Sequence, residues 1–143
     1  MTIINRQAIV PYTNLQMFAL VDAIEEYPNF LPWCNTTHII ERNANEVKAT
    51  LWLSKGGIKK SFSTLNRLHP GKRIEMQLLD GPFRHLEGAW QFHELDSNTC
   101  KVALNLEFEF SNKLIALALG GIFHHITDTM VDAFIKRAHE IYG

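Results

Sequence analysis

The sequence predicts an α+β domain in which a curved antiparallel sheet of about seven strands wraps around a long C-terminal helix. Through most of the middle of the chain, apolar residues recur at every second position, as in strands with one buried face. Near the C-terminus the apolar residues recur at helical spacing instead. Short helices are expected after the first strand, where the spacing is also helical.

Length and composition indicate one ordinary globular domain spanning residues 1–143. The chain is 46% hydrophobic and 20% charged, and its net charge of -1 argues against DNA as a partner. Cys34 and Cys100 are too few for a disulfide framework, and no further pair has zinc-ligand spacing. No secretory signal is visible, and the most apolar run, 114–123, is shorter than the roughly 20 residues that span a bilayer. We therefore expect a cytoplasmic protein without a transmembrane segment.

The N-terminal part is predicted to form a strand and then a helix. Residues 3–10 are rich in β-branched side chains, which favour a strand. Thr13 and Gln16 have the spacing of a capping box, in which a hydroxyl and an amide satisfy free backbone groups at a helix start. The helical stripe continues to about Glu26, and Pro28 is expected to end the helix because the residue before a proline avoids helical angles.

The middle of the chain is predicted to form a meander of antiparallel strands. Alternation of apolar and polar residues is clearest at 46–53, 85–93 and 101–110. Turn-forming residues lie between these segments, including Gly56-Gly57 and Asp80-Gly81-Pro82. Strands of this length joined by tight turns pair antiparallel with their neighbours, with one wet and one dry face.

The C-terminal segment is predicted to be one helix over residues 112–142, capped by Ser111 or Asn112. It alone has an apolar stripe broad enough to cover the dry face of the sheet. Because a straight helix does not match a concave sheet perfectly, an internal apolar cavity is expected between them. The opposite side of the helix carries a polar stripe of His125, Asp128, Asp132, Lys136 and His139.

Two segments of the chain have distinctive motifs, the aromatic, proline-flanked Tyr27–Cys34 and the Gly-Pro-Phe of Gly81–Leu86. Less specific motifs follow at Trp90–Phe92, Leu106–Ser111, Met130–Phe134 and Arg137-Ala138. In this order, the segments resemble the coenzyme Q-binding and ribosome-association-toxin family, also labelled oligoketide cyclase or lipid-transport-like proteins. This family belongs to the START-like helix-grip superfamily, and the resemblance covers almost the whole chain.

The resemblance implies two functions of different classes. One branch of the family binds ubiquinone in the helix-grip cavity and supports respiration without catalysing a reaction. The bacterial branch includes toxins that bind the large ribosomal subunit and block subunit association. The targeting segment of mitochondrial members is absent here, so we expect a bacterial cytoplasmic protein. A polyketide cyclase-like enzyme is the third alternative, and the near absence of acids and bases on the dry faces argues against it.

A hydrophobic ligand needs apolar walls, an entrance and a few polar groups that orient its head group. Bulky loop residues are candidate lids, and the guanidinium of Arg84 could donate to a quinone carbonyl or a phosphate. The alternative is that the apolar residues are ordinary core and Arg84 is a solvated charge. The candidate ligand-binding residues are Phe30, Leu31, Trp33, Phe83, Arg84, Trp90, Phe92, Phe123, Ile126 and Met130. No cofactor is required, and ubiquinone is the bound molecule that the resemblance favours.

Three lysines, Lys55, Lys59 and Lys60, flank Gly56-Gly57 at a predicted hairpin tip. They could contact phosphates of the large ribosomal subunit, or anionic lipids in a transient membrane-surface contact. The alternative is an ordinary solubilising edge, on which lysine prevents aggregation between strands.

We expect neither a catalytic residue nor a metal site. Cys34 and His38 would share one face of a strand but lie more than about 10 Å apart, so Cys34 is predicted to be an inert buried thiol. The polar residues near His125 lie along one wet stripe, where Asp132 and Lys136 form an ordinary solvated ion pair at the i, i+4 spacing.

Overall fold

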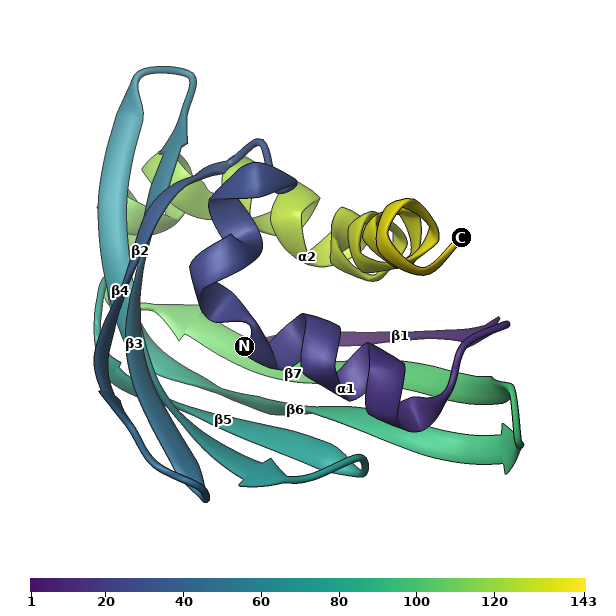
Figure 1. The fold of residues 1–143 in the computed structure, drawn as a ribbon. Helices are drawn as coiled ribbons and strands as arrows, with labels where there is room; N and C mark the ends of the chain where they lie inside the picture. Colours follow the sequence, from purple (N-terminus) through teal and green to yellow (C-terminus); the bar gives the residue numbers. More distant parts are fainter.

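Seven strands, two α-helices and one short 3₁₀ helix make up the computed structural model, which describes residues 1–143 (Figure 1). Strand β1 (Thr2–Val10) is followed by α1 (Asn14–Asp22) and the 3₁₀ helix η1 (Ile24–Asn29). The remaining elements are β2 (Cys34–Arg42), β3 (Glu46–Lys55), β4 (Ile58–His69), β5 (Arg73–Asp80), β6 (Phe83–Asp96), β7 (Thr99–Phe110) and α2 (Lys113–Tyr142). The predicted α+β fold is confirmed.

All seven strands form one antiparallel sheet in the order β1-β7-β6-β5-β4-β3-β2. Strands β2 to β7 follow one another as hairpins, whereas α1 and η1 carry the chain from β1 at one edge to β2 at the other. The sheet curls around α2, with α1 and η1 alongside it (Figure 1). Burial alternates strictly along β7 through Phe108, which gives the sheet its dry inner face.

One glycine sets how closely two central strands approach. Gly88 of β6 faces Leu106 of β7 in the strand register. A Cβ atom at Gly88 would lie 2.2 Å from the carbonyl oxygen of Asn105 and 2.9 Å from the Cα of Leu106. Only a residue without a side chain fits this position.

The first helix begins as predicted but ends earlier. Thr13 and Gln16 form both hydrogen bonds of the capping box. The expected end at Pro28 was wrong, because α1 stops at Asp22 and Pro28 lies inside η1. The buried side chains of η1, Ile24 and Tyr27, are three residues apart. That spacing is the period of a 3₁₀ helix, so the change of helix type keeps both side chains against the core.

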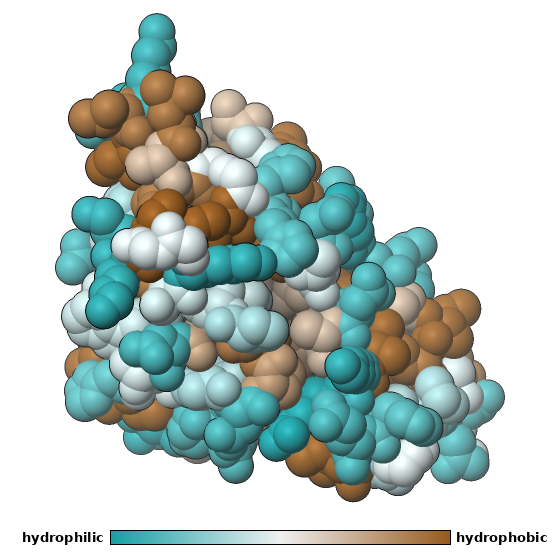
Figure 2. All heavy atoms as spheres, turned by 90° about the horizontal axis from the view of Figure 1, so that it is seen from above, coloured by the Kyte–Doolittle hydropathy of each residue, from teal (hydrophilic) through white to brown (hydrophobic).

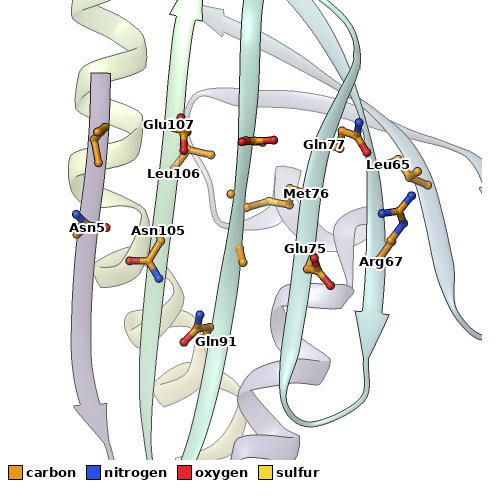
Figure 3. Close-up of a pocket in the computed structure, with 14 residues that line it drawn as sticks. Asn5, Leu65, Arg67, Glu75, Met76, Gln77, Gln91, Asn105, Leu106 and Glu107 are labelled. Carbon is orange, nitrogen blue, oxygen red and sulfur yellow. The ribbon is translucent and has the colours of Figure 1, made fainter. Parts of the chain in front are cut away.

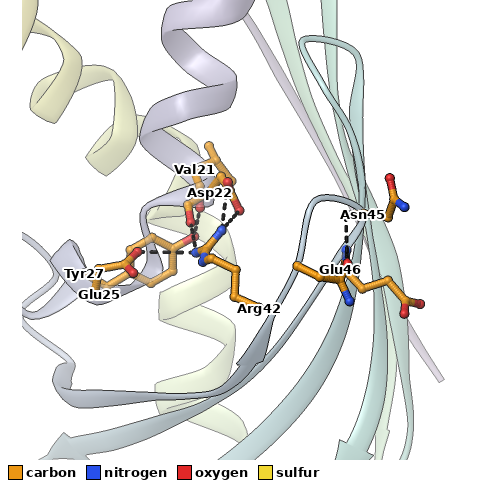
Figure 4. Close-up of polar contacts among 8 residues, drawn as sticks. Val21, Asp22, Glu25, Tyr27, Arg42, Asn45 and Glu46 are labelled. Carbon is orange, nitrogen blue, oxygen red and sulfur yellow. Dashed lines mark hydrogen bonds and ion pairs between the residues drawn. The ribbon is translucent and has the colours of Figure 1, made fainter.

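A polar network fixes the junction of α1 and η1 to the edge strand β2 (Figure 4). The Nη1 atom of Arg42 lies 3.1 Å from both carboxylate oxygens of Asp22, and its Nη2 donates to the Asp22 carbonyl at 2.9 Å. The same Nη2 lies 3.4 Å from Glu25. Beside them the hydroxyl of Tyr27 donates to the carbonyl of Val21. Burial raises the pKa of Tyr27, so its hydroxyl keeps the proton that it donates.

Helix α2 is a single 30-residue helix whose N-cap, Asn112, accepts a hydrogen bond from the Ile115 amide at 2.8 Å. The helix continues through Gly120 and Gly121, where an added Cβ would meet no atom within 4 Å. Tertiary packing therefore does not require glycine at either position. The buried side chains of α2 are Leu119, Phe123, Ile126, Thr127, Val131, Phe134 and Ala138.

The apolar character of α2 extends further than the run 114–123 indicated. By length and composition alone it could cross a membrane, with a mean hydropathy of 1.4 over 18 residues. In this fold the helix packs along the concave face of the sheet (Figure 1). The polar stripe is exposed as expected. Asp128 pairs with Arg6 of β1, whereas the expected ion pair between Asp132 and Lys136 does not form.

Candidate functional site

A cavity of about 80 Å³ lies between the concave face of the sheet and α2. Fourteen of its 17 lining residues are hydrophobic. They are contributed by η1, by the segment before β2, by β3 to β7 and by α2. The lining residues are Ile24, Tyr27, Trp33, Leu51, Leu53, Phe62, Thr64, Asn66, Met76, Leu86, Trp90, Leu104, Leu106, Phe123, Ile126, Thr127 and Met130. The expected apolar cavity is present, but pockets for drug-sized ligands measure roughly 300–1,000 Å³. A larger ligand therefore needs the cavity to widen.

One end of the cavity is closed by a phenylalanine cluster, which consists of Phe62, Phe83, Phe108, Phe110 and Phe123. Phe123 lies at its centre, stacked on Phe108 at 4.6 Å and edge-on to Phe83 at 4.9 Å between ring centroids. Beyond the cluster a hollow of about 10 Å³ lies beneath the β3–β4 tip, residues 55–60. Phe123 lines both spaces, so its ring is part of the wall between the cavity and this end of the molecule.

The cavity wall carries an unpaired amide hydrogen-bond donor. Thr64 and Asn66 of β4 are only 6% and 8% exposed, and both point to the inner face. The Thr64 hydroxyl donates to Asn66 Oδ1 at 2.9 Å, which leaves Asn66 Nδ2 without a partner. Thr127 is already satisfied, because its hydroxyl donates to the Phe123 and His124 carbonyls at 3.1 Å. Asn66 can therefore donate to an acceptor on a bound molecule.

Thr64 and Asn66 were not among the ligand-binding residues predicted from the sequence. The signal was available, since polar residues at 64 and 66 share the side-chain direction of Leu68 on one strand. Polar residues at inward positions of a strand are uncommon and point to a specific contact.

Five of the predicted ligand-binding residues line the cavity. They are Trp33, Trp90, Phe123, Ile126 and Met130. These residues come from the segment before β2, from β6 and from α2, and the curvature of the sheet brings them together (Figure 1).

The other five predicted residues lie outside the cavity. Leu31 and Phe92 are buried in the adjoining core, and Phe83 belongs to the phenylalanine cluster. Phe30 packs on Phe134 at 5.2 Å between centroids, at the surface end of η1. Arg84 lies on the outer face, with its side chain 66% exposed and its Nη2 3.4 Å from the Ser111 carbonyl.

Comparison with known proteins places this architecture in a family. Residues 10–135 match the family model described as polyketide cyclase / dehydrase and lipid transport. The chain belongs to this family. Relatives named Ribosome association toxin RatA are 47% identical over 98% of this chain and 97% of their own length in Vibrio cholerae, and 42% identical over 99% of both chains in Pseudomonas aeruginosa. The mitochondrial Coenzyme Q-binding protein COQ10 of Dictyostelium discoideum is 30% identical over 92% of this chain and 66% of its own.

Solved structures of low sequence identity to this chain share its fold. The Zhui aromatase/cyclase from Streptomyces superposes with a TM-score of 0.85 at 14% identity, over 99% of this chain and 96% of that one. A START superfamily protein from Mycobacterium smegmatis gives a TM-score of 0.80 at 16% identity, over 97% and 98% of the two chains. The predicted START-like helix-grip fold is thereby confirmed.

A larger hollow of this family member lies on the outside of the sheet (Figure 3). Its volume is about 440 Å³, and it crosses the outer face from β1 to β4. Nine of its 14 lining residues are not hydrophobic, among them Asn5, Arg67, Glu75 and Asn105. A polar groove open to water gives an apolar ligand little to bury, so the inner cavity is the better candidate site.

The outer face also brings together His85, Glu87 and Glu107, whose ligand atoms lie within 4.8 Å of one another. No metal site was predicted from the sequence, in which this group is not visible because Glu107 joins it across the β6–β7 register. His85 Nε2 lies 3.4 Å from Glu107 and 3.5 Å from Glu87. When His85 is protonated it offsets the repulsion between the two directly paired glutamates.

The prediction that Cys34 and His38 share one face of a strand was wrong. A register shift between Cys34 and Thr36 reverses the side-chain direction, so Cys34 is buried and His38 is exposed. Burial raises the pKa of Cys34 to about 11, and no base contacts its thiol. The predicted burial of Cys34 is confirmed, and its inertness stays a prediction.

Both cysteines are expected to resist alkylation in the folded protein. Because burial raises the pKa of Cys34 to about 11 and also raises that of Cys100, the thiolate is scarce at neutral pH and increases only as the pH approaches that range. Iodoacetamide labelling, followed by intact-mass spectrometry, should be slow when folded and complete when unfolded. Rapid labelling of folded protein at neutral pH would contradict this assignment.

Proposed function

We propose that this chain is a non-catalytic binding protein for a hydrophobic small molecule held between the sheet and α2. The observation that carries the proposal is an apolar cavity whose lining includes an unpaired amide donor, Asn66 Nδ2. No carboxylate, histidine, lysine or arginine lines it, and the Tyr27 hydroxyl already donates to Val21. General acid–base chemistry would need such a group within reach of the ligand.

The favoured ligand is ubiquinone or a related isoprenoid lipid. A quinone carbonyl can accept from Asn66, and the isoprenoid tail can lie along the apolar wall. At about 25 cal/mol per Å² of apolar surface, burial of a few hundred Å² supports useful affinity. The coenzyme Q-binding name of one relative supports the same class.

Organic extraction of the purified protein, followed by mass spectrometry, tests this function. We expect an isoprenoid quinone or lipid in near-stoichiometric amount. Trp33 and Trp90 line the cavity, so added short-tailed ubiquinone should also quench tryptophan fluorescence saturably. A protein that is empty after purification and gives no saturable quenching would refute the proposal.

Replacing Asn66 with Leu should weaken quinone binding roughly tenfold, because the quinone carbonyl loses the amide group that donates a hydrogen bond to it. Binding of an alkane chain of matched length should change far less. The control Asn105→Leu alters an amide on the outer face and should leave both affinities unchanged. Fluorescence titration provides the measurement, and equal losses for quinone and alkane would exclude Asn66 as the head-group donor.

Association with the large ribosomal subunit is the second candidate function. The names of relatives up to 47% identical to this chain favour it. Lys55, Lys59 and Lys60 are exposed at the β3–β4 tip, as expected from the sequence, where they could contact RNA phosphates. Sedimentation with purified large subunits should then fall steeply with salt and be lost when all three lysines become Glu. Salt-insensitive sedimentation, or none, would remove this candidate.

A further inference from the structure

The first turns of α2 expose apolar side chains to solvent. Leu114 and Leu117 are 77% and 84% exposed, the largest values among the exposed large hydrophobic residues. Only 28% of the most apolar 18-residue stretch of α2 is buried, although its composition would suit a membrane. Packing against the sheet therefore does not account for the apolar character at this end of the helix.

These leucines lie at the same end of the molecule as the basic β3–β4 tip. The hollow beneath the tip is lined both by Lys55 and Ile58 of the hairpin and by Leu119 and Ile122 of α2. Seen from above, apolar side chains gather over this end with hydrophilic side chains at their margin (Figure 2). We call this surface the basic-apolar end, and its residues are Leu114, Leu117, Lys55, Lys59, Lys60 and Lys113.

The charge of the basic-apolar end differs from that of the whole chain. The net charge of the protein is -1, yet four lysines lie here and none of them forms an ion pair. Unpaired lysines around exposed leucines are complementary to a partner that has a negatively charged outer layer and an apolar layer beneath it. An anionic lipid bilayer has this layered chemistry.

We propose that the basic-apolar end docks on an anionic lipid bilayer, with Leu114 and Leu117 entering the acyl boundary and the four lysines meeting lipid phosphates. RNA would also attract the lysines, but it offers no apolar layer for the two leucines. No aromatic residue lies within the tip to stack on a base. The leucines therefore favour lipid over nucleic acid.

Docking in this orientation sets the phenylalanine cluster next to the membrane. Phe83 and Phe123 line the hollow beneath the tip, and Phe123 also lines the cavity. If the proposed ligand binding holds, an isoprenoid lipid could pass between bilayer and cavity without crossing water. Docking itself does not depend on that ligand and can be measured with the delipidated protein.

Sedimentation with vesicles tests the docking surface. Delipidated protein is mixed with vesicles of phosphatidylcholine alone or with an equal amount of phosphatidylglycerol. We expect binding to the mixed vesicles and much weaker binding to phosphatidylcholine. Leu114→Glu with Leu117→Glu should lower binding roughly 100-fold, because two apolar side chains no longer enter the lipid. Lys55, Lys59 and Lys60 changed to Gln should lower it to a similar degree, as should high salt.

The matched control is Ile9→Glu with Leu95→Glu, which adds the same two charges at exposed positions of β1 and β6. Circular dichroism verifies that all variants fold. The proposal fails if the wild-type protein does not sediment with anionic vesicles. It fails as well if the leucine pair and the control pair lower vesicle binding equally. It also fails if the lysine variants lose only their sedimentation with ribosomes, because the β3–β4 tip would then bind RNA and not lipid. Quinone titration of the same samples separates failure of docking from failure of ligand binding.

Discussion

Phe123→Ala is expected to join the inner cavity to the hollow beneath the β3–β4 tip and to speed release of a bound apolar ligand roughly tenfold. Phe123 is 5% exposed and forms part of the wall between the two spaces. Its loss should also cost about 3–5 kcal/mol of folding free energy, as for other buried phenylalanines. Stopped-flow tryptophan fluorescence with a preloaded quinone measures the release rate.

The control for Phe123→Ala is Phe92→Ala. Phe92 is 4% exposed, stacks against Trp90 and packs edge-on to Phe18, outside the cavity lining. It should lose similar stability without opening a path to the β3–β4 tip. Phe123→Leu provides a milder variant if Phe123→Ala does not fold. Equal release rates for Phe123→Ala, Phe123→Leu, Phe92→Ala and wild type would show that the ligand leaves by another path.

Gly88→Ala should destabilise the protein by about 3 kcal/mol or prevent folding. The new Cβ would lie 2.2 Å from the Asn105 carbonyl oxygen, so β6 and β7 would have to separate at the centre of the sheet. Urea unfolding followed by circular dichroism measures the loss. Gly121→Ala is the matched control, because its Cβ meets open space within a helix. That variant should gain about 0.5–1 kcal/mol, and similar behaviour of the two variants would contradict the close approach at Gly88.

Local sequence patterns predicted the parts of the fold in which apolar residues repeat at the spacing of a strand or a helix. Strict alternation identified β3, β6 and β7, and the spacing of Thr13 and Gln16 identified the start of α1. The sequence could not reveal the contacts of Arg42 with Asp22 and Glu25, because these residues meet only once the chain has folded.

The candidate site was predicted only in part, because local patterns reveal some of its residues and the folded chain alone reveals the others. Trp90 reaches the cavity from an inward-facing position of β6, which alternation reveals, whereas Trp33 was predicted only as a bulky apolar loop residue and lines the cavity from the segment before β2. The register shift after Cys34 reverses that alternation, and no local pattern marks it. Asn66 was overlooked because its side chain breaks the apolar pattern from which inward positions were assigned.

The adjacent glycines of α2 divide the helix into two halves that differ in their stability against local unfolding. Each glycine costs roughly 1 kcal/mol of helix propensity relative to alanine, and neither is compensated by a close contact. Backbone amides before Gly120 should therefore exchange with deuterium sooner than those near Phe134, as a separate cooperative unit that opens below the free energy of global unfolding. Transient fraying of that half would displace Leu119, which lines the hollow beneath the tip together with Phe123, and so loosen the packing of the Phe123 ring. The cavity of about 80 Å³ would then be able to widen for a longer molecule.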